Sequence, residues 1–132
     1  MSDERYRRGV GQMDELQGER AGPKMRAALQ AISPEFEAFA VSGSYGDVYS
    51  RPGMSKRDRQ LVTISILAGI GGCEPQLERH LIAALKFGLT PDEIVETFIQ
   101  VAAYAGQARA NNAMRVAGEV FARAGVKASG AA

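Results

Sequence analysis

Apolar residues recur along this chain at the three- and four-residue spacing of amphipathic helices. A clear case is the segment Pro75 to Phe87, whose inward stripe is expected to hold Leu77, Leu81, Ala84 and Leu85. No stretch shows sustained alternation of apolar and polar residues, the pattern of a half-buried strand. The sequence therefore predicts an all-α fold, with residues 1–132 forming a single domain of about six or seven helices.

Capping residues show where several of these helices begin. Ser55 is placed to cap a helix from Lys56 to Ile70, and Thr90 with Glu93 three residues later has the spacing of a capping box. Ser33 is expected to cap a further helix that frays by Ser42-Gly43, with a helical continuation to about Tyr49 left open. Other helices are expected over residues 23–32, 75–87 and 109–124.

The two ends of the chain have weaker patterns. Three glycines interrupt the first segment, so residues 1–20 are expected to form a loose N-terminal arm or helix. Residues 126–132 have little to bury and are expected to be disordered. In the helix after Ser33, Phe36 and Phe39 are expected to face inward.

The helix from Lys56 to Ile70 differs from the others because, from Leu61 onward, apolar side chains cover almost every direction around its axis. A helix that is apolar on all sides is normally buried. We expect it to lie in the centre of a bundle or under a second subunit.

Composition narrows the classes of function. Sixteen basic and fifteen acidic residues leave a formal charge of +1, so neither a nucleic acid nor a membrane is expected as a partner. A single cysteine excludes a disulfide within one chain. No apolar run approaches the roughly 20 residues of a membrane span, and no secretion signal is recognisable, so a cytoplasmic location is expected.

His80 is the one histidine and the leading candidate for chemistry. The helical wheel turns it away from the charged side of its helix, so it is expected to be mostly buried and neutral, and able to act as an acid or a base. The alternative is a core histidine whose ring is bonded to a backbone carbonyl. Cys73, just before the same helix, is either a thiolate favoured by the helix N-terminus or a small residue in a tight turn.

Two arginines are candidate anchors for a carboxylate, because a guanidinium can bind both carboxylate oxygens. They are Arg51, in an Arg-Pro-Gly turn, and Arg109, at the start of the last helix. Beside Arg51 lie Asp47, whose alternative role is a salt bridge, and Tyr49, whose alternative role is a core ring. One histidine without further ligands at helical spacing predicts no metal site.

Several motifs taken together resemble the carboxymuconolactone decarboxylase family, within the superfamily that includes alkylhydroperoxidase D. They cover about Phe36 to Ala124 and comprise Gly-Asp-Val-Tyr-Ser-Arg-Pro-Gly at 46–53, Arg-Gln-Leu-Val-Thr at 59–63, Leu-Glu-Arg-His-Leu-Ile-Ala-Ala-Leu at 77–85, Gly-Leu-Thr-Pro-Asp-Glu-Ile at 88–94, Val-Ala-Ala-Tyr-Ala-Gly at 101–106 and Asn-Asn-Ala-Met-Arg-Val-Ala at 111–117. The resemblance implies an all-α subunit that forms a homo-oligomer, commonly a trimer or a hexamer.

The resemblance also separates two kinds of chemistry. The peroxidase branch has Cys-x-x-Cys-x-x-x-His and an upstream glutamate, whereas this chain has Cys73, Gln76 and His80, with Gln60 or Leu61 near the glutamate's place. One thiol of the pair is missing, so dithiol chemistry is not expected.

The decarboxylase branch removes CO₂ from a carboxylated lactone without a cofactor. The resemblance would place His80 at the reacting centre, with Asp47 as a second catalytic candidate. The candidate substrate-binding residues are Tyr49, Arg51, Cys73, Arg109 and Asn112. The chain departs from the branch in two places: it reads Gly-Gln-Met-Asp-Glu-Leu-Gln-Gly at 11–18 instead of Arg-Arg-x-Val-Leu-Gly, and Ala108 replaces a usual proline.

The expected function is a carboxy-lyase acting on a small carboxylated lactone or a related enolisable acid, in the breakdown of aromatic compounds. Two alternatives stay open at this point. One is a redox protein that uses the single thiol of Cys73. The other is a non-catalytic oligomer that binds a small molecule.

Overall fold

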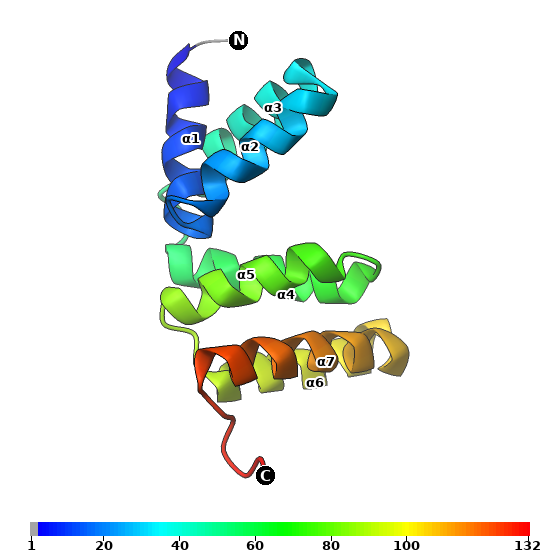
Figure 1. Ribbon diagram of the computed structural model, residues 1–132. Coiled ribbons are helices and arrows are strands. Elements are labelled where there is room, and N and C mark those ends of the chain that lie inside the picture. The colour runs from blue at the N-terminus through cyan, green and yellow to red at the C-terminus, as the bar shows by residue number, and fades with distance from the viewer. Residues whose placement is uncertain (1–2) are drawn as a thin grey trace. The chain divides into compact units, whose positions relative to one another are not determined.

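The computed structural model describes residues 3–132, and over this range the chain forms seven α-helices and one π-helical segment. The prediction of an all-α fold is confirmed. The chain divides into two compact units, Met1–Ser55 and Lys56–Ala132 (Figure 1). That they act as one domain stays a prediction. Within the described residues, none of the helices combines the length and the apolar character needed to cross a membrane.

The N-terminal unit consists of α1 (Asp3–Gln17), α2 (Ala21–Ile32), α3 (Pro34–Ala40) and the π-helical segment η1 (Val41–Tyr49). Helix α3 begins as the sequence predicts: the Ser33 hydroxyl accepts a hydrogen bond from the Phe36 amide at 3.1 Å, and Pro34 occupies the first turn. The chain stays helical to Tyr49, but it widens into a π-helix after Ala40.

Two glycines explain how α1 and η1 pack together. A Cβ on Gly9 would overlap the carbonyl group of Val41, and a Cβ on Gly46 would lie 2.6 Å from the carbonyl oxygen of Arg5. The two backbones therefore approach more closely than other residues permit. Gly9, which weakens the helical pattern in the sequence, is a contact point in an ordered helix.

The expectation that Phe36 and Phe39 face inward is wrong, because their exposed fractions are 57% and 70%. The buried side of α3 instead carries Glu37, which is 2% exposed. Its carboxylate accepts a hydrogen bond from the Tyr6 hydroxyl at 2.6 Å. The apolar pattern failed here because a paired carboxylate can take a buried position that spacing alone assigns to an aromatic ring.

The C-terminal unit is a bundle of four helices, α4 (Lys56–Ile70), α5 (Glu74–Lys86), α6 (Pro91–Ala105) and α7 (Gln107–Ala124). Figure 1 shows α4 beside α5 and α6 beside α7, with α4 also packed on α6 and α5 on α7. The bounds of α4 are those predicted from the sequence.

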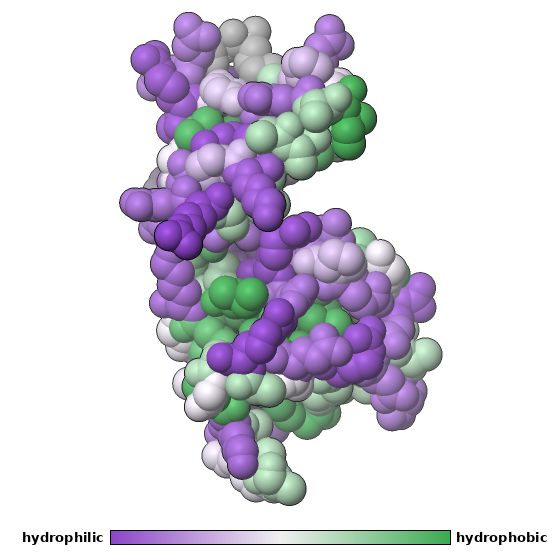
Figure 2. All heavy atoms as spheres, viewed as in Figure 1, coloured by the Kyte–Doolittle hydropathy of each residue, from purple (hydrophilic) through white to green (hydrophobic). Residues whose placement is uncertain are grey.

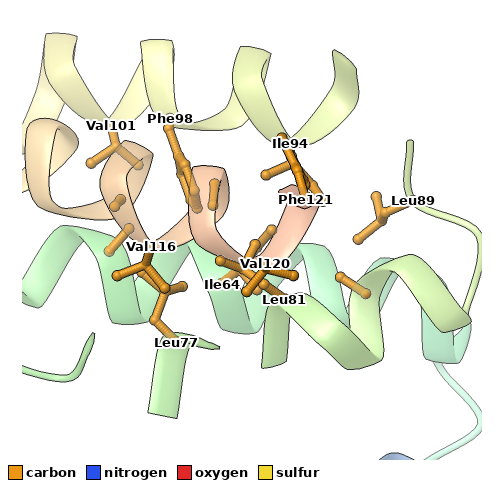
Figure 3. Close-up of a cluster of buried hydrophobic side chains, with 14 of the residues drawn as sticks. Ile64, Leu77, Leu81, Leu89, Ile94, Phe98, Val101, Val116, Val120 and Phe121 are labelled. Atoms are coloured by element: carbon orange, nitrogen blue, oxygen red, sulfur yellow. The ribbon is translucent and has the colours of Figure 1, made fainter. Parts of the chain in front are cut away.

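All four helices contribute to the core of this unit. Ile64 from α4, Leu81 from α5 and Phe98 from α6 are fully buried, and Val120 from α7 is 2% exposed (Figure 3). Burying a side chain of this size contributes about 1.5–3 kcal/mol. These contacts fix α4 and α5 side by side.

Polar contacts hold the N-terminal end of α6. Thr90 and Glu93 form the predicted capping box, and Arg57 at the start of α4 makes an ion pair with Glu93. In the tail, for which the sequence predicts disorder, the Ser129 amide and hydroxyl donate hydrogen bonds to the Asp92 carboxylate at 2.6 and 2.7 Å.

One face of α4 is exposed although the helix is apolar on every side. Ile64 and Ala68 are buried, whereas Val62, Ile66 and Ile70 have exposed fractions of 42%, 55% and 56%. Figure 2 shows apolar side chains among the polar ones at the surface. The single chain therefore does not cover α4 completely.

The close approach of α1 and η1 makes a prediction about stability. Gly9→Ala should lower the free energy of unfolding by about 1–3 kcal/mol, because the new methyl group overlaps the Val41 carbonyl. Gly11→Ala is the matched control in the same helix, since nothing lies within 4 Å of its Cβ position. The control should be neutral or gain up to about 1 kcal/mol. Urea unfolding measures both, and equal stability of the two variants would contradict the packing.

Candidate active site

His80 lies on α5 and faces a glutamine of the neighbouring helix. Its Nδ1 is 3.0 Å from Oε1 of Gln60 on α4, which is a hydrogen-bonding distance. Gln60 is completely buried, and His80 is partly buried. This contact of Nδ1 is with a side-chain amide from another helix, whereas the sequence analysis considered a backbone carbonyl.

The surroundings of His80 keep its ring neutral. Burial lowers the pKa of His80 from 6.5 to about 4, and the positive charge of Arg79 adds to this effect. At neutral pH the imidazole therefore carries one proton, on one of its two nitrogens. An amide oxygen accepts hydrogen bonds, so the contact with Oε1 of Gln60 favours a proton on Nδ1 of the ring.

The side chain of Gln60 is only half satisfied. Its Nε2 is buried and has no hydrogen-bond partner among residues 3–132. The same is true of Nε of Arg59, the preceding residue on α4. A buried donor without an acceptor costs about 1–3 kcal/mol. Donors left in this state are suited to an acceptor that the described chain does not supply.

Cys73 lies at the N-cap of α5, the helix that carries His80. The thiol is free and partly buried. Two glycines with positive φ, Gly71 at 72° and Gly72 at 75°, join α4 to this position. Seven residues separate Cys73 from His80, which corresponds to roughly 10 Å along a helix axis. The two candidates therefore belong to one element but to different turns.

Arg109 lies at the same end of the bundle as Cys73. Its Nε donates a hydrogen bond to the carbonyl oxygen of Ile70 at 3.1 Å, and its side chain lies against Gly71. The arginine thus caps the C-terminus of α4 while its side chain is exposed. Asn112, also exposed, follows three residues later on α7 and lies on the same side of that helix.

Asp47 belongs to the N-terminal unit, where it pairs with two arginines of α1. Nε of Arg5 donates to its carboxylate at 3.0 Å, a second hydrogen bond comes from Nη2 of Arg5, and Arg8 lies 3.8 Å away. The hydrogen bonds from Arg5 hold the pKa of Asp47 below its usual range. This is the salt-bridge role considered as the alternative. An acid/base role for Asp47 stays a prediction.

Tyr49 and Arg51 also belong to the N-terminal unit. Tyr49 is 8% exposed, and its ring stacks on that of Tyr45 with centroids 5.7 Å apart. Arg51 is exposed in the turn after η1, where its amide donates to the carbonyl of Val48 at 3.1 Å. The candidates therefore fall into two sets: Asp47, Tyr49 and Arg51 in one unit, and His80, Cys73, Arg109 and Asn112 in the other.

The sequence analysis missed Gln60 as the partner of His80. The resemblance puts Gln60 or Leu61 near the place of the peroxidase branch's glutamate, but only the packing of α4 on α5 brings Gln60 to the histidine. The buried pair of Tyr6 and Glu37 was missed for the same reason. Its signal would have been an acidic residue on the side of α3 that faces the rest of the unit.

The described residues contain no group of three or more histidine, cysteine, aspartate or glutamate side chains that could hold a metal ion. What the C-terminal unit offers is a neutral imidazole oriented by an amide. Such a group can accept a proton at one nitrogen and return it.

The low pKa of His80 predicts how stability depends on pH. Between about pH 6.5 and 4 the unfolded chain binds a proton at His80 that the folded chain does not, so stability falls as the pH falls through this window. The full loss from this group is about 3 kcal/mol. We expect the difference in unfolding free energy between wild type and His80→Gln to be constant above pH 7 and to shrink by this amount near pH 4. A difference that does not change with pH would contradict the burial of the ring.

Comparison with known proteins gives the context of this site. The model of the carboxymuconolactone decarboxylase family matches residues 34–119. A 4-carboxymuconolactone decarboxylase of Acinetobacter baylyi is 36% identical over 127 residues, which are 96% of this chain and 94% of that protein. An uncharacterized 15.0 kDa protein of Paracoccus denitrificans is 30% identical over 96 residues, 72% of each chain.

The range that the family model matches includes His80, Gln60 and the other candidate residues. The matches support a decarboxylase-like function and an enzymatic activity. The resemblance inferred from the sequence is confirmed, and this chain belongs to the carboxymuconolactone decarboxylase family.

Proposed function

We propose that this protein is a cofactor-free carboxy-lyase that acts on a small carboxylated lactone or a related enolisable acid, with His80 as its acid/base residue. The main support is the histidine itself, a partly buried, neutral imidazole held by a buried amide. The name of the Acinetobacter relative, 4-carboxymuconolactone decarboxylase, supplies the first substrate to test.

The decarboxylation requires that the substrate is held in position and that a proton is supplied to the product. When the bond to the carboxylate breaks, CO₂ leaves and the electron pair moves into the conjugated lactone, giving a dienolate. A proton must then add to a ring carbon. His80 is neutral before binding, and the negative charge of a nearby substrate carboxylate raises the pKa of an imidazole. His80 would take a proton from solvent as substrate binds and deliver it to the dienolate.

The substrate also needs an anchor for its negative charge. Arg109 is the proposed anchor in the C-terminal unit, with Asn112 beside it as a hydrogen-bond donor and Cys73 nearby at the N-cap of α5. An exposed guanidinium whose Nε is already held by a helix end is partly pre-organised for a carboxylate. A catalytic role for Asp47 and a substrate-binding role for Tyr49 and Arg51, which belong to the N-terminal unit, stay predictions.

We also propose that the protein is a homo-oligomer, a trimer or a hexamer. The support is the exposed face of α4, formed by Val62, Ile66 and Ile70, together with exposed Tyr104 on α6. Exposed apolar side chains that gather on one face of a helix commonly mark an interface between proteins. The cytoplasmic location inferred from the sequence stays a prediction.

Activity on 4-carboxymuconolactone tests the proposal. Wild type should release CO₂, and His80→Gln should lower kcat by about 10²- to 10⁴-fold, the usual contribution of an acid/base group. Loss of the absorbance of the conjugated lactone and capture of CO₂ measure the rate. Glu119→Gln, a change at an exposed residue of α7 outside the proposed site, serves as the control and should keep kcat within a few-fold. Full activity of His80→Gln would reject the role of the histidine.

The oligomer can be tested separately. Light scattering after size exclusion should show a trimer or hexamer for wild type, and Ile66→Asp should shift the protein to smaller species because a charge would be buried in the interface. Ile82→Asp, at a residue that is also about half exposed but lies on α5, is the matched control. A monomeric wild type would contradict the interface.

A further inference from the structure

We propose that Gln60 is a positioning residue for His80: its amide oxygen holds the imidazole in the Nδ1–H tautomer, so that Nε2 is the nitrogen that takes up and delivers the proton. The inference concerns a residue outside the set of candidate site residues. Its catalytic consequence rests on the proposed function, whereas the tautomer itself can be measured without any turnover.

The first argument for this role is the distance between the two side chains. Oε1 of Gln60 lies 3.0 Å from Nδ1 of His80, and the two residues come from different helices that pack against each other. A histidine side chain has no fixed tautomer of its own, and the hydrogen bond made by one nitrogen decides the state of the other. An acceptor on Nδ1 therefore assigns the proton to Nδ1.

The second argument is the burial of Gln60. Gln60 is 0% exposed, and nearby Ile64 on the same helix is also 0% exposed. Closely packed side chains cannot swing to other rotamers without a cost. The amide is therefore fixed in place, and it fixes the ring in turn.

The third argument is that the amide of Gln60 carries no charge. A carboxylate at this position would attract the imidazolium form and raise the pKa of His80. An amide orients the ring without this effect, which agrees with an imidazole that stays neutral at pH 7. The site thus begins the reaction with a neutral ring that is unprotonated at Nε2 rather than with a charged acid.

The unpaired Nε2 of Gln60 defines the competing arrangement. If the amide were turned over, its NH₂ group would donate to Nδ1, the ring would carry its proton on Nε2, and Oε1 would be the atom without a partner. Both arrangements leave one atom of the amide unpaired. They differ in the tautomer of His80, which is the quantity to be measured.

The test uses the fact that the chain has one histidine. In a protein labelled with ¹⁵N, the two ring nitrogens of His80 can be identified by their couplings to the ring protons, and a protonated nitrogen resonates well upfield of an unprotonated one. At pH 7 wild type should show Nδ1 protonated and Nε2 unprotonated. This pattern opposes the intrinsic preference of histidine side chains for the Nε2–H form. A wild-type spectrum of the Nε2–H form would overturn the proposal.

Two substitutions of Gln60 test whether its amide determines the tautomer of His80. Gln60→Leu removes the acceptor and should shift the ring toward the Nε2–H tautomer. Gln60→Glu keeps an acceptor, so it should retain the Nδ1–H tautomer and raise the pH at which His80 titrates. Gln107→Leu makes the same chemical change at an exposed residue whose amide contacts Asn111, and it should leave the His80 signals unchanged. If Gln60→Leu does not fold, the wild-type and Gln60→Glu spectra still decide the question.

Kinetics separate this proposal from the proposed function. If wild type decarboxylates its substrate, Gln60→Leu should lower kcat on the order of tenfold to a hundredfold with little change in KM, as expected for a residue that orients a catalytic group. An Nδ1–H tautomer in an inactive wild type would uphold the positioning role and reject the lyase. An active wild type with the Nε2–H tautomer would do the reverse.

Discussion

The contact between Gln60 and His80 is the interaction on which the rest of the proposed site depends. It joins α4 to α5 at 3.0 Å, and it selects which nitrogen of the ring can exchange a proton. The contact exists because Ile64, Leu81 and the other core side chains hold the two helices together. Burial by the same packing lowers the pKa of His80 to about 4. One structural cause thus sets the orientation, the tautomer and the charge of the imidazole.

In the N-terminal unit, the main structural feature is the contact that holds the π-helical segment η1 against α1. Gly9 and Gly46 allow α1 and η1 to touch through their backbones, and the pairing of Arg5 with Asp47 ties the same two elements through side chains. A carboxylate bound by a guanidinium stays ionised, so Asp47 keeps its negative charge and links η1 to α1. Tyr49, stacked on Tyr45 in the same segment, is held by packing.

Much of the fold could be predicted from the sequence because helix ends carry local signals. Ser33, the Thr90–Glu93 capping box and the bounds of α4 were recognisable from single residues and their spacing. The environment of His80 was not, since its partner Gln60 is twenty positions away and becomes a neighbour only through helix packing. The inward placement of Phe36 and Phe39 failed because Glu37, paired with Tyr6, occupies the buried side of α3. Spacing predicts which residues share a face, but tertiary contacts decide what that face meets.

In the proposed mechanism, a substrate carboxylate charges an imidazole that the free protein keeps neutral. The most direct measurement is the NMR titration of His80 with and without a saturated lactone carboxylate, a ligand that cannot form the dienolate and so remains bound unchanged. The account predicts that saturation with this ligand raises the pKa of His80 from about 4 toward neutrality, with the new proton on Nε2. A titration curve that is the same with and without the bound carboxylate would contradict it.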